Sequence, residues 1–411
     1  MRKLGNWSII SFICLISIWV CIGCQKQTAE KPKEKTKLEL WHYWDIPENQ
    51  KHLEVLVEEF NESQDNIEIE LSYIPDEDFK KKLALAMAEE TMPDIALVDS
   101  SDFQFLHHMK PFAQLDEENP ELKKYIDKAL EPCMVDGKIY GQPFGVNCTG
   151  MFYNKKLLES AGCTVPKNWK EFHETAKKVS NETVSGFAIT ALQTEESMYE
   201  FLPLLWSVGG DTNQINSGLS KQAFELLSEM EKDGSLSRQS ISLTMGDLTN
   251  QFIQGKIAMM FNSSMAISSI KNAAPDMEFG VAQIPGDKQF VSVAGGEILA
   301  VADNENKEAA FEFLRYLSEP QRMQMYIDDF GFLAPVQEIM EQQFQNESEK
   351  RAFIELYKNA RVRELSTTWP KVSLSLADTL KQVLMEDGTL DQILERSAMR
   401  INEIEGGTDE K

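Results

Sequence analysis

Residues 38–102, LELWHYWDIPENQKHLEVLVEEFNESQDNIEIELSYIPDEDFKKKLALAMAEETMPDIALVDSSD, decide the fold of this chain. The segments 38–44 and 94–98 are apolar enough for buried strands, and 67–74 alternates as a strand does. Between these strands, Pro47 opens one helix with apolar residues at 3.6-residue spacing, and a second helical stretch follows. This order of strands and helices predicts an α/β fold with a parallel sheet.

Ligands of such a sheet bind beyond the carboxyl ends of its strands. Here those ends carry Trp44, Asp45 and the run DSSD at 99–102. Downstream, 137–146 is expected to be extended, and Asn154 and Asn168 are expected to cap helices. We expect further helices at about 195–207, 219–233, 247–255 and 264–273, strands near 257–260 and 291–302, and an almost wholly helical region from 306 onward that is broken at Pro320, Pro335 and Pro370.

Composition and charge exclude several classes of function. The chain has 411 residues, which predicts two or three domains, and its formal net charge is -25. A nucleic-acid binder needs lysine and arginine to replace phosphate counterions, so this charge has the wrong sign. Attachment to an anionic lipid surface through a basic patch is disfavoured for the same reason.

The N-terminus predicts export and anchoring. Arg2 and Lys3 precede an apolar run, as in a secretory signal. An uncleaved anchor helix is the alternative, although the run is short for a membrane span. Residues 20–24, VCIGC, resemble the lipobox of bacterial lipoproteins, which implies a signal peptide at 1–23 and lipidation of Cys24. Residues 24–37 are polar and are expected to form a flexible tether, with a disordered tail at 406–411.

Cysteine and histidine give no sign of a metal or redox site. With Cys24 lipidated, Cys133, Cys148 and Cys163 remain, so at most one disulfide could form. No histidines have metal-ligand spacing beyond the adjacent pair at 107–108, and adjacent histidines usually point apart. The common hydrolase, nucleotide-binding and metalloprotease motifs are absent from the sequence. We therefore expect no enzymatic activity, no metal and no cofactor.

Aromatic residues gather at predicted strand ends and turns. Trp44 ends a strand beside Asp45, Trp206 precedes a Gly-Gly pair, and Trp369 precedes a proline. Sugars offer flat C–H faces to aromatic rings and hydroxyls to carboxylates and amides, so such residues suit a carbohydrate cleft. The competing interpretation is that each tryptophan belongs to the hydrophobic core.

Several motifs occur in an order that resembles a known family. They are 38–63, TMPDIALVDSSDF at 91–103, GKIYGQPFGVNCTGMFYNKKLLESAGCTVPKNWKEF at 137–172, FIQGKIAMMFNSS at 252–264, and VAGGEILAV at 293–301 followed by KEAAFEFLRYLSEPQ. Together they are similar to the family 1 extracellular solute-binding proteins of bacterial ABC importers, of the sugar-binding type. The resemblance covers nearly all of 36–405.

The resemblance implies two lobes, each a sheet flanked by helices, with a hinge and an interlobe cleft. Lobe 1 would be 36–146 plus 295–332, and lobe 2 would be 147–294 plus 333–405. The chain would cross between the lobes near 145–149, 290–295 and 331–335. The implied ligand-binding residues are Trp44, Asp45, Asp99, Ser101, Asn147, Tyr199, Trp206, Asn262, Gly295, Gly296 and Trp369.

The implied function is that of a lipid-anchored, extracellular and monomeric binding subunit. It would bind a mono- or oligosaccharide and deliver it to membrane permease subunits, without a nucleic-acid partner. Polyamines are a rival ligand class, because tryptophan and aspartate also bind cations. A glycerol-phosphate ligand would need arginine or lysine in the cleft. A cell-surface glycosidase is the alternative from another class of protein.

Overall fold

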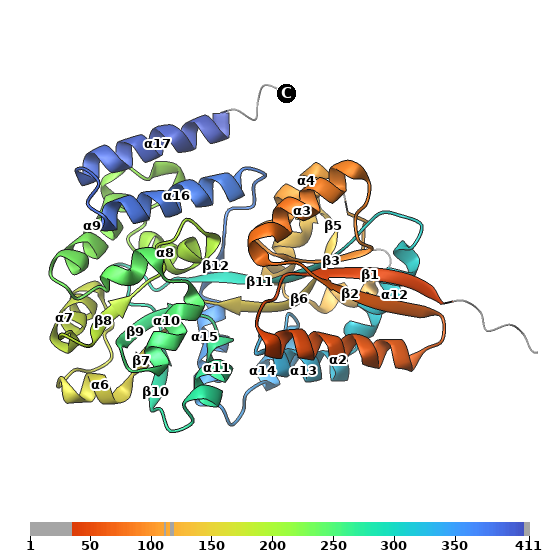
Figure 1. Cartoon of the computed structure of the whole chain (residues 1–411), viewed down its shortest axis with the longest axis horizontal. Helices are drawn as coiled ribbons and strands as arrows, with labels where there is room; N and C mark the ends of the chain where they lie inside the picture. Colours follow the sequence, from red (N-terminus) through yellow and green to blue (C-terminus); the bar gives the residue numbers. More distant parts are fainter. Residues whose placement is uncertain (1–34, 111, 116–118, 407–411) are drawn as a thin grey trace, which may run out of the picture.

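The computed structural model describes residues 35–110, 112–115 and 119–406, and its helices and strands form two halves side by side (Figure 1). The predicted signal peptide, Cys24 and most of the tether lie outside these residues. Within them, no helix is long and apolar enough to cross a membrane. The three cysteines of this part, Cys133, Cys148 and Cys163, are free thiols.

The first half is built on a six-stranded sheet of order β12-β11-β3-β1-β2, with β6 also paired to β11. Strands β1, β2 and β3 are parallel, which confirms the βαβαβ prediction. Strand β11 runs antiparallel to both β3 and β6. The strands are β1 (Thr36–His42), β2 (Ile67–Tyr73), β3 (Ile95–Asp99), β6 (Gly141–Cys148), β11 (Ser292–Val301) and β12 (Ala360–Val362).

The second half is built on a four-stranded sheet of order β10-β7-β9-β8, and a small β4–β5 hairpin lies apart from both sheets. Lobe 1 denotes the half that carries the six-stranded sheet, and lobe 2 denotes the half that carries the four-stranded sheet. The remaining strands are β4 (Met134–Val135), β5 (Lys138–Ile139), β7 (Gly150–Asn154), β8 (Ser185–Ala188), β9 (Ile257–Asn262) and β10 (Phe279–Ala282).

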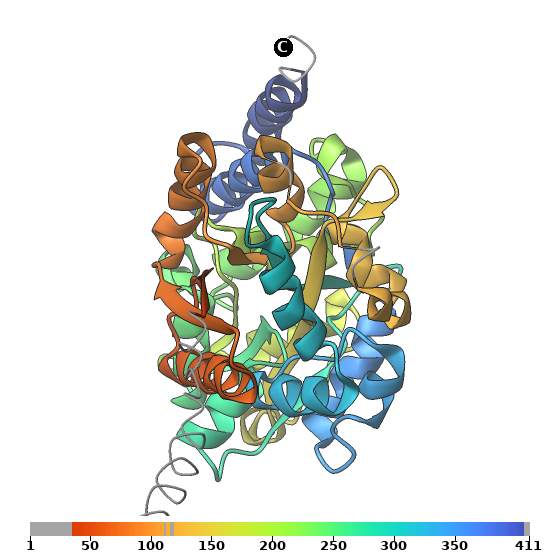
Figure 2. The same cartoon turned by 90° about the vertical axis from the view of Figure 1, so that its right-hand side faces the viewer.

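Helices cover both sheets, and α17 lies at the end of the molecule away from α2 (Figures 1 and 2). Those of the first 300 residues are α2 (Pro47–Ser63), α3 (Asp76–Glu89), α4 (Phe103–Met109), α5 (Asp127–Leu130), α6 (Lys155–Ser160), α7 (Trp169–Val179), α8 (Glu195–Ser207), α9 (Gly218–Lys232), α10 (Met245–Ile253) and α11 (Ala266–Ala273). The later ones are α12 (Lys307–Leu317), α13 (Pro320–Phe330), α14 (Gln337–Gln342), α15 (Ser348–Lys358), α16 (Trp369–Leu384) and α17 (Leu390–Gly406).

Local sequence signals explain several helix starts. Asn154 caps α6 by accepting a hydrogen bond from the Leu157 N–H, and Asn168 caps α7 by accepting one from the Glu171 N–H. The break expected at Pro370 is confirmed, because α15 ends at Lys358 and Pro370 stands in the first turn of the next helix, α16, where its missing N–H costs nothing. The short strand β12, in contrast, lies in a region that the sequence predicts to be helical.

The long strands β6 and β11 run between the two halves, and the chain that follows α13 joins them there (Figure 1). Leu333 exchanges two backbone hydrogen bonds with Val146 of β6, of 3.0 and 2.8 Å. Gly145 lies so close to this segment that a Cβ added to it would stand 2.7 Å from Phe332. Three stretches of chain therefore meet where the family resemblance places the crossings, whose exact boundaries stay a prediction.

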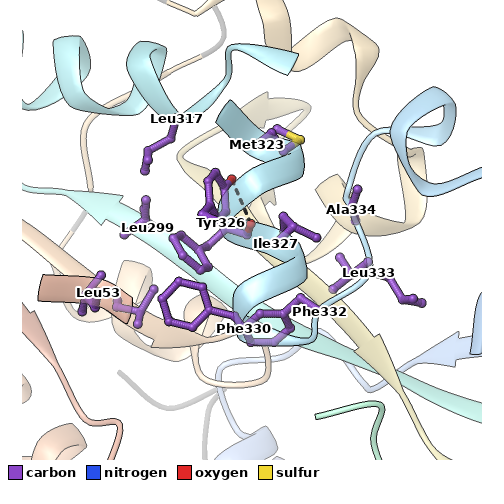
Figure 3. Packing of buried hydrophobic residues seen from close by; sticks show 14 of the residues in the cluster. Leu53, Leu299, Leu317, Met323, Tyr326, Ile327, Phe330, Phe332, Leu333 and Ala334 are labelled. Atoms are coloured by element: carbon purple, nitrogen blue, oxygen red, sulfur yellow. Dashed lines mark hydrogen bonds between the residues drawn. The ribbon is translucent and has the colours of Figure 1, made fainter. Parts of the chain in front are cut away.

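An aromatic core lies beside these crossings. Phe330 and Phe332 pack among buried residues from α2, α13 and β11 (Figure 3). The hydroxyl of Tyr326 donates to the backbone oxygen of Phe144 at 3.2 Å, drawn as the dashed line in Figure 3. This packing fixes the lobe 1 end of β6 against α13, close to the predicted ligand side of the sheet.

Candidate functional site

Arg363 follows β12 and is bound by residues of both lobes. Its side chain is 4% exposed. Nη1 donates to Oε1 of Glu195 at 2.7 Å, while Nη2 donates to Oδ1 of Asp99 at 3.1 Å and to Oγ of Ser100 at 3.4 Å. Burial disfavours the charged guanidinium, but the carboxylates of Asp99 and Glu195 outweigh it and raise the pKa of Arg363. The arginine therefore stays charged, with its charge balanced from both halves.

The two carboxylates are held by their own elements. Asp99 is the last residue of β3, and its Oδ1 also accepts a hydrogen bond of 2.7 Å from the N–H of Ser101. Glu195 stands in the first turn of α8, where a negative charge is favoured by the helix dipole. It also accepts hydrogen bonds from the hydroxyl of Ser373 and, at 3.2 Å, from Nε1 of Trp369. Both partners of Arg363 thus have further contacts that hold them in place.

Tyr199 and Asn147 lie beside this arginine. The hydroxyl of Tyr199 donates to Oδ1 of Asn147 at 2.9 Å, and the Arg363 guanidinium lies 5.6 Å from the centre of the Tyr199 ring. Gly295 pairs with Asn147 in the sheet. A Cβ added to Gly295 would stand 2.6 Å from Asn147 Oδ1 and 3.0 Å from the Tyr199 ring, so only glycine leaves room for both side chains.

A second carboxyl group lies on the lobe 1 sheet. Glu297 pairs with Asp99 across β11 and β3, so their side chains share one face. Its Oε2 accepts a hydrogen bond of 2.6 Å from the hydroxyl of Tyr43. Burial raises the pKa of Glu297, and the negative charge of Asp99 raises it further, although the hydrogen bond from Tyr43 opposes the rise. At a given pH, the protonated form of Glu297 is therefore more populated than that of a solvent-exposed glutamate.

Acidic residues of the two lobes also influence one another electrostatically. Burial raises the pKa of Glu196 on α8, and the charges of Asp76 and Asp45 from lobe 1 and of Asp247 from lobe 2 raise it further. The N–H of Met245 opposes this by donating to Glu196 Oε2 at 3.2 Å. Carboxylates on opposite lobes therefore lie close enough to repel one another electrostatically.

Lys80 offsets part of this negative charge. Its Nζ lies 2.6 Å from Oδ1 of Asp102. Burial disfavours the charged ammonium, but the Asp102 carboxylate outweighs it and raises the pKa of Lys80. Burial raises the pKa of Asp102 to about 6, helped by the charges of Asp99 and Glu195, while Lys80 pulls it down. Lys80 and Arg363 are thus both paired with carboxylates.

The structure brings five of the residues predicted from the sequence around Arg363. Asp99 accepts a hydrogen bond from Arg363, and Gly295 lies beside its Nη2. Tyr199 lies beside the guanidinium, Asn147 contacts Tyr199, and Trp369 contacts Glu195. Arg363, Glu195, Ser100 and Glu297 belong to the same cluster but are not among the predicted residues, although Arg363 lies six residues before Trp369 and Glu297 directly follows the Gly295–Gly296 pair. The five are Asp99, Asn147, Tyr199, Gly295 and Trp369.

Trp44 and its neighbours make different contacts. The ring of Trp44 is 6% exposed and packs against Phe330 and Phe144, with ring centres 4.8 and 5.6 Å apart. Asp45 beside it is exposed. Ser101 is buried, and its hydroxyl has no hydrogen-bond partner among the described residues. Of these three predicted residues, Asp45 is the one that offers its side chain to solvent.

The remaining predicted residues lie in lobe 2 or on β11. Trp206 is 3% exposed, and the Arg361 guanidinium lies 4.6 Å from its ring centre. Asn262 is buried and donates to Thr249 Oγ1 at 3.0 Å. Gly296 has a φ of 143°, and a Cβ there would stand 2.3 Å from the backbone oxygen of Gly145. The backbones of β11 and β6 therefore approach each other so closely at Gly296 that a side chain does not fit there.

The residues that the structure describes contain no group of three or more side chains that could hold a metal ion. The cluster consists of carboxylates, an amide, a phenol and two paired cations, placed where two α/β halves meet. Such groups can accept hydrogen bonds from polar ligands and can stack on them. Two α/β halves joined by crossing strands, with polar groups converging between them, define a two-lobed binding protein.

The comparison with known proteins agrees. The family model for bacterial extracellular solute-binding proteins matches residues 55–352, and the chain belongs to this family. A putative binding protein of Brucella abortus is 28% identical over 301 residues, covering 70% of this chain and 73% of its own length. The multiple sugar-binding protein of Streptococcus mutans is 24% identical over 367 residues, with 83% and 84% covered.

Solved structures share the fold. The ABC-transporter solute-binding protein of Thermotoga lettingae, bound with α-D-tagatose, superposes with a TM-score of 0.83 at 20% identity. The match covers 90% of this chain and 100% of that one. The two-lobed architecture implied by the sequence motifs is thereby confirmed.

Proposed function

We propose that this chain binds a mono- or oligosaccharide between its two lobes and delivers it to the permease of an ABC importer. The observation that carries this proposal is the convergence of Asn147, Tyr199 and a carboxylate of each lobe, Asp99 and Glu195, around Arg363. Carboxylate and amide oxygens accept hydrogen bonds from sugar hydroxyls, and the hydroxyl of Tyr199 orients the Asn147 amide among them. The relatives that bind sugars support the same ligand class.

The charge of the site argues against a phosphate-containing ligand. A phosphodiester or phosphate needs arginine or lysine donors that are free to turn toward it. Arg363 is bound by Asp99 and Glu195, and Lys80 is bound by Asp102. The surrounding carboxylates would repel an anion further. A glycerol phosphate is therefore disfavoured as the ligand.

The same charge favours a second candidate, a polyamine. The charges of Asp45 and Asp76 of lobe 1 raise the pKa of Glu196 of lobe 2, and a cation bound near these carboxylates would lower the repulsion between them. A neutral sugar must instead bring its own hydroxyl donors to each carboxylate. The two ligand classes therefore differ in how strongly they depend on carboxylate charge.

A thermal-shift panel tests the proposal directly. The chain would be heated with neutral mono- and oligosaccharides, spermidine and sn-glycerol 3-phosphate, each at low millimolar concentration. A ligand present at about 100 times its Kd stabilises the fold by about 2.7 kcal/mol, which is about 5 °C in Tm. We expect a shift with at least one sugar. A shift with spermidine alone would replace the sugar by a polyamine, and a shift with the phosphate alone would contradict the charge argument.

Anchoring and the absence of catalysis belong to the same proposal. Lipidation of Cys24 would hold the chain on the outer face of the membrane. Changing Cys24 to Ala should release the protein or leave its precursor uncleaved, whereas retention with normal cleavage would refute the anchor.

The sugar that shifts the Tm should be recovered intact after long incubation, and its cleavage would identify a glycosidase. We further propose that the chain acts as a monomer.

A further inference from the structure

Arg363 joins groups that belong to different lobes. Asp99 and Ser100 lie at the end of β3 in the lobe 1 sheet, whereas Glu195 and Trp369 begin two helices, α8 and α16, of lobe 2. The guanidinium is a planar fork with donors on both sides. Here one arm, Nη1, points to lobe 2 at 2.7 Å, and the other, Nη2, points to lobe 1 at 3.1 Å.

The lobe 2 side of this contact is reinforced by further contacts. Glu195 is itself fixed by hydrogen bonds from Trp369 and Ser373, and the Tyr199 ring lies beside the guanidinium. If the lobes separated, Arg363 could keep only one of its two carboxylate partners, Asp99 of lobe 1 or Glu195 of lobe 2. A buried guanidinium would then exchange one of its two carboxylate partners for water, so separation and loss of the contact must occur together.

We infer that Arg363 is a positioning residue that ties closure of the two lobes to the placement of Asp99 and Tyr199 at the ligand site. The residue acts through these two side chains, because at 4% exposure it has little surface for a ligand. The inference rests on the proposed function only in placing the ligand between the lobes. The tie between Arg363 and lobe closure concerns the ligand-free protein.

Two other contacts between the lobes provide a remote readout. The hydroxyl of Ser264, after β9, donates to the backbone oxygen of Gly331, after α13, at 2.7 Å. The side-chain amide of Asn272 on α11 donates to Glu48 on α2 at 3.3 Å. Neither contact involves Arg363. They loosen on removal of Arg363 only if the lobes themselves move apart.

Hydrogen–deuterium exchange of the full chain without ligand tests this inference. Arg363→Gln removes the guanidinium that bonds both lobes. Asp99→Asn removes only the negative charge of the lobe 1 partner, and the hydrogen bond between Arg363 and Glu195 remains. We expect both variants to exchange about five- to tenfold faster than wild type in segments 264–268 and 331–333, because opening exposes these amides more often. If Arg363→Gln does not fold, Asp99→Asn decides the question.

Arg400→Gln is the matched control. Arg400 Nη1 bonds Asp378 Oδ2 at 2.7 Å, and the two residues lie on the neighbouring helices α17 and α16 of lobe 2. The control loses an arginine–carboxylate pair and should leave both remote segments unchanged. Unchanged exchange there in Arg363→Gln and Asp99→Asn as well would show that Arg363 merely stabilises its own surroundings. That outcome would overturn the inference without touching the proposed function, since sugar binding is read in the separate panel.

Discussion

Replacing Trp44 by alanine decides whether this residue belongs to the core or to the ligand site. Its position after β1, beside Asp45, predicts a stacking ring from the sequence. In the structure its ring is 6% exposed and packs against Phe330 and Phe144. Removing a ring from the core lowers the stability of the fold, whereas removing a ring that only stacks on a ligand leaves stability nearly unchanged. One substitution therefore distinguishes the two roles.

The size of the effect follows from burial. A tryptophan buries about 150–250 Å², which at about 25 cal/mol per Å² amounts to about 5 kcal/mol. Core Trp→Ala substitutions cost about 3–5 kcal/mol, because the cavity relaxes only in part. At about 2 °C per kcal/mol, Trp44→Ala should lower Tm by about 8 °C. Differential scanning calorimetry or circular dichroism would measure the shift.

Two further variants make the test specific. Trp169→Ala removes the same side chain from the half-buried start of α7 and should cost clearly less. Trp44→Phe keeps one ring among Phe330 and Phe144 and should recover much of the loss. If Trp44→Ala melts within about 2 °C of wild type, the packing argument fails. Weaker sugar binding in that stable variant would instead restore Trp44 to the ligand site.

Three more expectations concern the site itself. Tyr199→Phe removes the hydrogen bond to Asn147 and should cost about 1 kcal/mol of sugar affinity, measured by calorimetry, with no change refuting the contact's importance. Asp45→Asn should weaken a neutral sugar modestly and a polyamine much more, because only the polyamine loses an ion pair; equal losses would refute this distinction. The folded-state pKa of Asp102 is raised to about 6, above its unfolded value, so its contribution to stability is present below about pH 4 and is lost as pH rises to about 6. Asp102→Asn should remove up to about 3 kcal/mol of that pH dependence in denaturant titrations, and an unchanged dependence would refute the assignment to Asp102.

The parts of the fold that could be predicted are those with local causes. The strand–helix alternation of 38–102 follows from hydrophobic periodicity, and Asn154 and Asn168 cap their helices through the next turn of the same chain. The helix expected at 195–207 has these bounds in the structure. Each of these signals acts over a few residues, so it can be read without knowing what packs against the segment.

Features that depend on distant partners escape such signals. Strand β12 is three residues long and exists because it pairs with the start of β11, about 70 residues earlier in the chain. Its sequence, ARV, lies between helical segments and shows no alternation that could reveal it.

Arg363 shows the same limit for the site. Its two carboxylate partners lie 168 and 264 residues away in the chain, so no local pattern connects them. The presence of an arginine near Trp369 would by itself suggest an anionic ligand. Its partners reverse that conclusion, because a guanidinium bound by two carboxylates offers little charge to a ligand and leaves the site acidic. The ligand class is therefore decided by how the charges pair across the lobes, which only the fold determines.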